Sequence, residues 1–84
     1  MKYRSRTELA SNILEAANDG ATKTKIMYKA FLSYAQLKEY LNVLIENNLL
    51  AYYSGDGTYK TTAKGIKFLD TTRQLGGLLE IQRQ

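Results

Sequence analysis

The 84-residue chain carries 12 Lys and Arg against 8 Asp and Glu, which gives a net charge of +4, and it has no Cys, His, Pro or Trp. This length supports one domain with one modest core. The missing Cys excludes a disulfide framework and a thiolate metal site, and the missing His removes the commonest general base and metal ligand. The basic excess suits a polyanionic partner, but it equally suits a small domain with a few extra lysines.

The first predicted element is a helix that begins near Arg6. Ser5–Glu8 has the sequence of a capping box, in which a hydroxyl and a carboxylate satisfy two backbone N–H groups. Asn18–Gly20 is expected to end this helix, with Gly20 in the left-handed C-cap position. In the basic arm at the start, Arg4 and Arg6 are explained equally well by phosphate contact and by solvation. The apolar residues recur at helical spacing and predict a core helix: Leu9, Ala10, Ile13, Leu14, Ala16 and Ala17.

Residues 22–48 predict two helices joined by a tight turn. Thr22 is the expected N-cap of a short helix over Lys23–Ala30. Ser33 and Gln36 form the capping box of a longer helix that is expected to end at Asn47-Asn48. The short helix and the corner after it are expected to bury Ile26, Met27, Ala30, Phe31 and Leu32.

The longer helix has one apolar face and one polar face. Its expected core positions recur at spacings of three and four: Leu37, Leu41, Leu44, Ile45 and Asn48. The opposite face carries Ala35, Lys38, Glu39, Asn42 and Glu46. A short helix, a three-residue link and a longer helix with a polar face match the helix-turn-helix plan, in which the second helix enters the major groove of DNA.

A β-hairpin and a last helix complete the predicted order. Leu49–Tyr53 and Thr58–Thr61 are β-prone runs on either side of the turn cluster Ser54–Gly57. A hairpin directly after a helix-turn-helix is a wing. Thr62 then caps a helix predicted from Ala63 to about Gln84.

The last helix has the pattern of a coiled-coil seam. Residues recur along it at spacings of three and four, as Gly65, Phe68, Thr72, Leu75, Leu79 and Gln82. Ile66 and Leu69 are expected to pack on the core, whereas Leu78 and Ile81 lie where a monomer offers little to cover them. Gly76-Gly77 permits a close helix crossing or breaks the helix, and we favour the crossing. The expected interface of a symmetric homodimer comprises Phe68, Thr72, Leu75, Gly76, Leu78, Leu79 and Gln82.

The order helix, helix, helix, two-stranded wing, helix resembles the winged-helix superfamily. More narrowly, it resembles the small archaeal winged-helix DNA-binding proteins that dimerise through a long C-terminal antiparallel coiled coil. Four segments carry the likeness, namely Lys25–Ala30, Leu32–Leu41, the wing tip Gly57–Tyr59 and Thr62–Leu69. Gly76-Gly77 departs from the family, which usually has coiled-coil formers there.

The resemblance implies an α+β winged helix-turn-helix fold of three helices and a two-stranded β-wing, followed by the dimerisation helix. We divide the chain into a DNA-binding part over residues 1–62 and a dimerisation helix over residues 63–84, within one continuous domain. Members of the family include candidate transcription regulators and architectural proteins of archaeal chromatin. The resemblance does not choose between these roles.

Two groups of residues are predicted to contact DNA. The first reads bases from the second helix of the motif and comprises Ala35, Gln36, Lys38, Glu39 and Asn42. Gln36 must choose between capping and base contact, and Glu39 and Glu46 also suit a merely solvated face. In the wing, Tyr59 alternatively packs on the hairpin, since adjacent strand residues point to opposite faces. The second group contacts phosphate and comprises Lys23, Lys25, Ser33, Tyr34, Tyr59, Lys60, Arg4 and Arg6.

The sequence therefore predicts a double-stranded DNA-binding protein that regulates transcription. One alternative is sequence-tolerant packing of chromatin, and another is a winged helix that binds only protein. No catalytic constellation is evident, so we expect no enzymatic activity, cofactor, metal or small-molecule effector. No apolar run is long enough to span a membrane and no signal peptide is evident, so we expect a cytoplasmic, nucleoid-associated protein.

Overall fold

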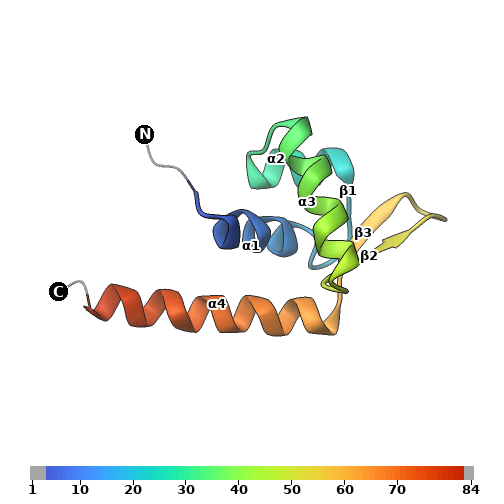
Figure 1. Ribbon diagram of the computed structural model, residues 1–84. Coiled ribbons are helices and arrows are strands. Elements are labelled where there is room, and N and C mark those ends of the chain that lie inside the picture. The colour runs from blue at the N-terminus through green and yellow to red at the C-terminus, as the bar shows by residue number, and fades with distance from the viewer. Residues whose placement is uncertain (1–3, 83–84) are drawn as a thin grey trace.

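The computed structural model describes the backbone of residues 4–82 and the side chains of residues 4–74. Figure 1 shows α1, α2 and α3 grouped on one side of α4, with the β2–β3 hairpin projecting at one end. No helix in the described part of the chain is long and apolar enough to cross a bilayer. The elements follow in the order α1 (Arg6–Ala16), β1 (Ala21–Thr22), α2 (Lys23–Ala30), α3 (Tyr34–Glu46), β2 (Leu50–Tyr53), β3 (Thr58–Thr61) and α4 (Ala63–Gln82).

Hydroxyl caps begin the first helices where the sequence predicts them. In α1, Ser5 Oγ accepts a hydrogen bond from Glu8 N at 3.1 Å, and the Glu8 carboxylate accepts one from Ser5 N at 3.1 Å. This completes the predicted capping box. In α2, Thr22 Oγ1 accepts from Lys25 N at 3.3 Å. The predicted bounds of α2 and the predicted start of α1 are therefore confirmed.

The sheet has three antiparallel strands in the order β1-β3-β2, whereas the sequence predicts only two. The extra strand, β1, pairs Ala21 with Tyr59. With two residues it is too short to show an alternating pattern, which is why it was missed. The expected end of α1 is also corrected, because Ala17 and not Gly20 is its C-cap. Gly20, with φ +92°, lies in the turn that leads from Ala17 into β1.

The predicted hairpin is confirmed. β2 and β3 pair in register from Leu50 opposite Thr61 to Tyr53 opposite Thr58. Gly57 has φ +65°, a conformation that favours glycine, and its N–H donates to the Tyr53 carbonyl at 2.9 Å. This glycine thus lets the chain reverse at the tip of the wing.

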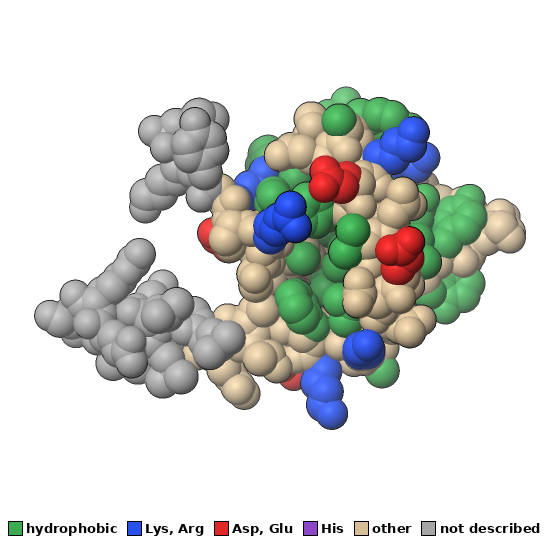
Figure 2. Space-filling view, in the orientation of Figure 1, with side chains coloured by type: hydrophobic (Ala, Val, Ile, Leu, Met, Phe, Trp, Pro, Cys, Tyr) green, Lys and Arg blue, Asp and Glu red, His purple; other side chains and the backbone are tan. Residues whose placement is uncertain are grey.

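One core lies beneath the sheet and between the four helices. Two predicted members are exposed, namely Phe31 and Asn48, which follow the ends of α2 and α3 in left-handed conformations. Figure 2 shows hydrophobic side chains at the surface between α3 and α4 and along the top, over the α2–α3 connection. The buried hydrophobic residues are Leu9, Ala10, Ile13, Leu14, Ala17, Ala21, Ile26, Ala30, Leu32, Leu37, Leu41, Leu44, Leu50 and Leu69.

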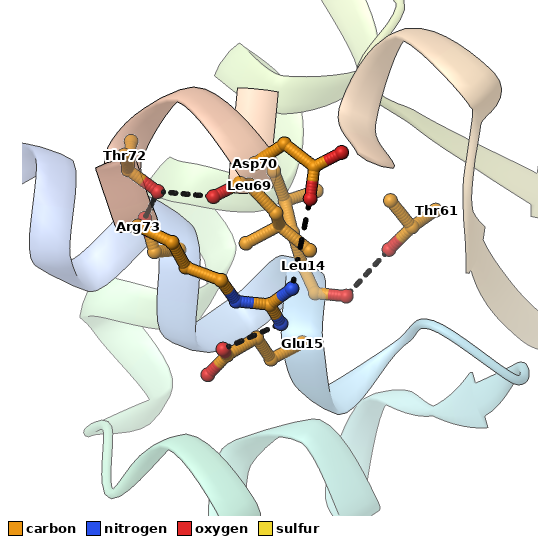
Figure 3. Close-up of polar contacts among 8 residues, drawn as sticks. Leu14, Glu15, Thr61, Leu69, Asp70, Thr72 and Arg73 are labelled. Carbon is orange, nitrogen blue, oxygen red and sulfur yellow. Dashed lines mark hydrogen bonds and ion pairs between the residues drawn. The ribbon is translucent and has the colours of Figure 1, made fainter. Parts of the chain in front are cut away.

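The sheet is tied to the end of α1 by Thr61, the last residue of β3. Its side chain is buried, and its Oγ1 donates to the Leu14 carbonyl at 2.6 Å (Figure 3). Its N–H donates to the Ala17 carbonyl at 3.1 Å. These two bonds fix the wing relative to the helical core.

The first half of α4 packs against its own domain. Phe68 packs on the core, and Ser11 of α1 donates to Thr72 Oγ1 at 3.3 Å. Figure 3 shows this junction, where Arg73 also lies 3.1 Å from Glu15 of α1. Phe68 and Thr72, predicted for a dimer interface, are therefore already partly covered within one chain. Ile66, expected on the core, is instead 37% exposed.

The second half of α4 continues as helix through Gly76 and Gly77 to Gln82. The alternative that Gly76-Gly77 ends the helix is thus not what the backbone shows, whereas the favoured close helix crossing stays a prediction. The predicted α+β fold of a helix-turn-helix with a β-wing is confirmed. The remaining predicted interface side chains lie outside the described ones, namely Leu75, Leu78, Leu79 and Gln82.

Candidate nucleic-acid interface

α3 exposes a stripe of three residues that can meet a ligand together. Ala35, Lys38 and Asn42 are all exposed, and a spacing of about 100° per residue places them on one side of the helix. Glu39 and Val43 lie on the neighbouring flank, where both line a groove shared with α1 and α4. The residues predicted for base contact therefore divide into an outer stripe and one carboxylate beside the groove.

Gln36, the remaining candidate for base contact, acts as a cap in the structure. Its Oε1 accepts a hydrogen bond from Ser33 N at 3.2 Å, and Ser33 Oγ accepts one from Gln36 N at 3.2 Å. A side chain held in this way cannot at the same time pair with both polar atoms of an adenine edge. Of the two roles foreseen for Gln36, capping is the one that this structure contains.

The first residues of α2 and α3 meet through their side chains at the surface. The Nζ atom of Lys23, the first residue of α2, is 5.8 Å from the ring centroid of Tyr34, the first residue of α3. Lys25 and Ser33 are exposed in the same two helix starts. Because backbone N–H groups at helix N-termini and lysine ammonium groups both bind phosphate, this corner is suited to a sugar-phosphate backbone.

The first part of the helix-turn-helix segment is basic, and its two carboxylates, Glu39 and Glu46, come later in α3. From Gly20 to Lys38 the sequence has four lysines and no Asp or Glu, whereas the other eight Lys and Arg equal the eight Asp and Glu elsewhere. All four lysines are exposed, and among them only Lys38 has an acidic neighbour in the chain, Glu39. A field of one sign over one surface attracts polyanions. These lysines are Lys23, Lys25, Lys29 and Lys38.

The basic arm has a structural role that the sequence did not reveal. The Arg4 guanidinium donates to Asn12 Oδ1 at 2.9 Å and to the carbonyls of Ala30 and Phe31 at 2.5 and 2.6 Å. It thereby satisfies carbonyls at the C-terminal end of α2, where a cation is favoured. Arg4 is thus engaged within the fold, whereas Arg6 is exposed at the start of α1.

The wing offers less to DNA than the sequence suggested. The rings of Tyr59 and Tyr52 pack across the hairpin with centroids 4.8 Å apart, so Tyr59 adopts the alternative foreseen for it. Lys60 is exposed, but it lines a shallow polar hollow together with Asp19 and Asp56. The two carboxylates reduce the attraction of this lysine for phosphate.

Sequence reasoning missed the groove beside Glu39. It lies between α1, α3 and α4, and Val43, exposed on the flank of α3, is the sequence signal that could have indicated it. No group of three or more residues suited to hold a metal ion occurs among the described residues. The groove is lined by Arg6, Thr7, Ala10, Glu39, Tyr40, Val43, Leu44, Leu49 and Phe68.

A helix-turn-helix with an exposed second helix, followed by a β-hairpin on the same core, defines a winged-helix domain. The chain belongs to the winged helix-turn-helix family, whose model matches residues 3–80. The fold is similar to the crystal structure of Sso10a-2, a DNA-binding protein from Sulfolobus solfataricus, with a TM-score of 0.87 and 21% sequence identity over 95% of this chain and 86% of that chain. Among curated protein sequences, none matches. The resemblance to small archaeal winged-helix proteins is thus confirmed at the level of the fold.

Proposed function

We propose that this protein binds double-stranded DNA, with α3 in the major groove and the β2–β3 wing against the backbone. One observation carries the proposal: the part of the helix-turn-helix from Gly20 to Lys38 has four exposed lysines and no Asp or Glu, and it leads into the exposed stripe Ala35, Lys38 and Asn42. Lysine and asparagine supply donors and acceptors for base edges, and alanine fits against a thymine methyl group. The family and the description of Sso10a-2 as a DNA-binding protein support the same function.

Within this proposal the protein is a transcription regulator that acts as a symmetric homodimer and is associated with the nucleoid in the cytoplasm. Figure 1 shows α4 continuing past the start of α1, and its last turns have no other described element beside them. The sequence gives these turns an apolar stripe, and an antiparallel coiled coil of two α4 helices would cover it. Two copies of α3 would then face two half-sites, as in other dimeric helix-turn-helix proteins. The apolar residues of these turns are Leu75, Leu78, Leu79 and Ile81.

The test compares Lys38→Ala with the matched control Lys67→Ala, which removes an exposed lysine from α4. Fluorescence anisotropy titrations with a labelled duplex should show weaker binding for Lys38→Ala and unchanged binding for Lys67→Ala. If Lys38→Ala weakens binding to every sequence and reduces the salt slope by about 1, Lys38 contacts phosphate. If it loses about 1–3 kcal/mol of binding free energy on one preferred site only, Lys38 contacts a base. If Lys38→Ala and Asn42→Ala both bound the duplex as tightly as the parent, α3 would not be the helix that contacts DNA.

The same titrations separate regulation from chromatin packing. The affinity should fall steeply with salt in both cases, because bound lysines release counterions from the phosphates. A regulator should prefer one genomic fragment over random DNA by roughly a thousandfold or more. A flat affinity across fragments would instead favour the architectural role, and affinity that persists at high salt would contradict this mode of binding altogether.

A further inference from the structure

Phe31, the C-cap residue of α2, combines a left-handed backbone conformation with an exposed side chain. Two residues other than glycine have positive φ in the described chain, Asn48 at +62° after α3 and Phe31 at +54° after α2. Asparagine tolerates this left-handed region, whereas a bulky side chain there is an outlier. Glycine is the usual residue at such a turn. The Phe31 side chain offsets none of this cost by burial, because the residue is 82% exposed.

Two further aromatic residues flank Phe31 at the same corner. Tyr28, in the last turn of α2, is 71% exposed, and Tyr34, the first residue of α3, is 55% exposed. We call these three residues the aromatic corner. Figure 2 shows hydrophobic side chains along the top of the molecule, over the α2–α3 connection, with basic side chains beside them. The backbone of the corner is held by the basic arm that precedes α1, because Arg4 donates to the Phe31 carbonyl at 2.6 Å.

The charge around the aromatic corner indicates the kind of partner. The corner lies inside the segment from Gly20 to Lys38, which has four lysines and no carboxylate. Lys29 is adjacent to Tyr28 in the chain, and the Lys23 ammonium lies over the Tyr34 ring. Exposed rings interspersed with cations are the combination that holds a single-stranded nucleic acid, because the rings stack on bases and the cations neutralise phosphates.

We propose that the aromatic corner binds single-stranded DNA by stacking unpaired bases on Phe31 and its flanking tyrosines. A base inside a duplex is already stacked on both faces, so only an unpaired base can offer a free face to these rings. The charge favours a polyanion over an apolar protein surface. This second binding mode goes beyond duplex binding by the outer stripe of α3, and it uses Phe31 and Tyr28, which have no part in that proposal.

The test uses the full chain with a single-stranded oligothymidine and, separately, an oligonucleotide that carries 2-aminopurine. Phe31→Asn should weaken single-strand binding by roughly 5- to 150-fold, the range expected for the loss of one stacked base. It should also abolish the quenching of 2-aminopurine that stacking on the parent produces. Phe31→Tyr should restore both, because it returns a ring to the same position. The melting temperature of Phe31→Asn should equal or exceed that of the parent, since asparagine tolerates the left-handed conformation.

Tyr53→Asn is the matched control, because Tyr53 is an aromatic residue that is 52% exposed in the wing and lies outside the corner. Tyr28→Ala is a second variant within the corner and should weaken single-strand binding without affecting the duplex. Unchanged single-strand affinity in Phe31→Asn would overturn the proposal. An equal loss of single-strand affinity in Tyr53→Asn would also overturn it. If Phe31→Asn bound the single strand normally but had a changed sedimentation mass, the aromatic corner would be a protein interface.

Duplex titrations distinguish failure of this proposal from failure of the proposed function. Lys38→Ala should lose duplex affinity, and Phe31→Asn should keep it. If the parent binds the single strand and not the duplex, the aromatic corner stands and the role of α3 falls. If the parent binds only the duplex, duplex binding by α3 stands and the proposal for the aromatic corner is overturned.

Discussion

The side chain of Gln36 lies where helix stability and DNA recognition compete for the same atoms. It is exposed near the start of α3, as a base-contacting residue must be, yet its Oε1 accepts from Ser33 N. For Gln36 to pair with a base edge, this bond would have to break, and the first turn of α3 would lose half of its capping box. Its principal contribution is therefore to the stability of α3.

We expect Gln36→Ala to lower the free energy of unfolding by about 0.5–2 kcal/mol, the range found for lost caps. Duplex affinity should change little. Gln36→Glu is the matched control, because glutamate is the other residue of the capping box at this position and should keep the stability. Thermal melts and duplex titrations of both variants measure the two effects. A normal melt combined with a large loss of affinity in Gln36→Ala would reassign the residue to base contact.

Sequence predicted single residues well where their partners are near in the chain. The caps Ser5 and Ser33 bond groups three residues away, and four consecutive residues are enough to recognise them. The partners of Arg4 and Thr61 lie 26 and 47 residues away, so no local pattern could indicate them. The hydrophobicity of Phe31 predicts a core position, but it carries no information about the φ angle, which is positive in the structure.

At the scale of elements, the contact between α4 and the α3–β2 corner depends on Gly65. A Cβ atom on Gly65 would lie 2.3 Å from the Leu49 carbonyl oxygen and 2.5 Å from Thr61 Cγ2. Both neighbours are held in place, since the Leu49 carbonyl accepts a hydrogen bond from Thr62 N at 3.1 Å and Thr61 is anchored to α1. The glycine is therefore required by close approach in a helix, where it would otherwise be unfavourable.

Gly65→Ala should destabilise the protein by roughly 1–3 kcal/mol, the usual cost of overpacking, because a backbone carbonyl cannot rotate away. The matched control is Gly55→Ala in the hairpin loop, since a Cβ there meets nothing within 4 Å. Chemical denaturation of both variants measures the difference. Equal stability of the two variants would show that α4 can shift freely on its domain.

Periodicity predicted the elements but not which neighbours cover them. The spacing of α4 marks one apolar face along its length, and this pattern alone predicts that a second chain covers the face. The structure covers Phe68 and Thr72 with α1 and the core of the same chain. Apolar residues at spacings of three and four indicate that one face of a helix is covered, but they do not indicate which element covers it. β1 was missed for a related reason, because a strand of two residues is defined only by its partner.

At the scale of the whole molecule, the proposed homodimer rests on the apolar residues beyond Thr72. Leu79→Asp should shift the protein from dimer to monomer, because it would bury an unpaired charge in the seam. Gln74→Asp places the same charge on α4 away from the seam spacing and should leave a dimer intact. Sedimentation equilibrium at micromolar protein measures both. A monomer mass for the parent chain would remove the coiled-coil proposal and leave the winged-helix domain as the unit that meets DNA.

The close contact at Gly65 also sets the direction in which the rest of α4 extends from the domain. Beyond Gly65 the helix runs on to Gln82, about 25 Å at 1.5 Å per residue, so a tilt of about 10° at the glycine would move the far end by roughly 4 Å. In a dimer joined through those far ends, the direction fixed by the Leu49 carbonyl would set the separation of the two copies of α3. A bulkier residue at 65 would then change which half-site spacing the protein prefers, while the preferred bases within each half-site stayed the same.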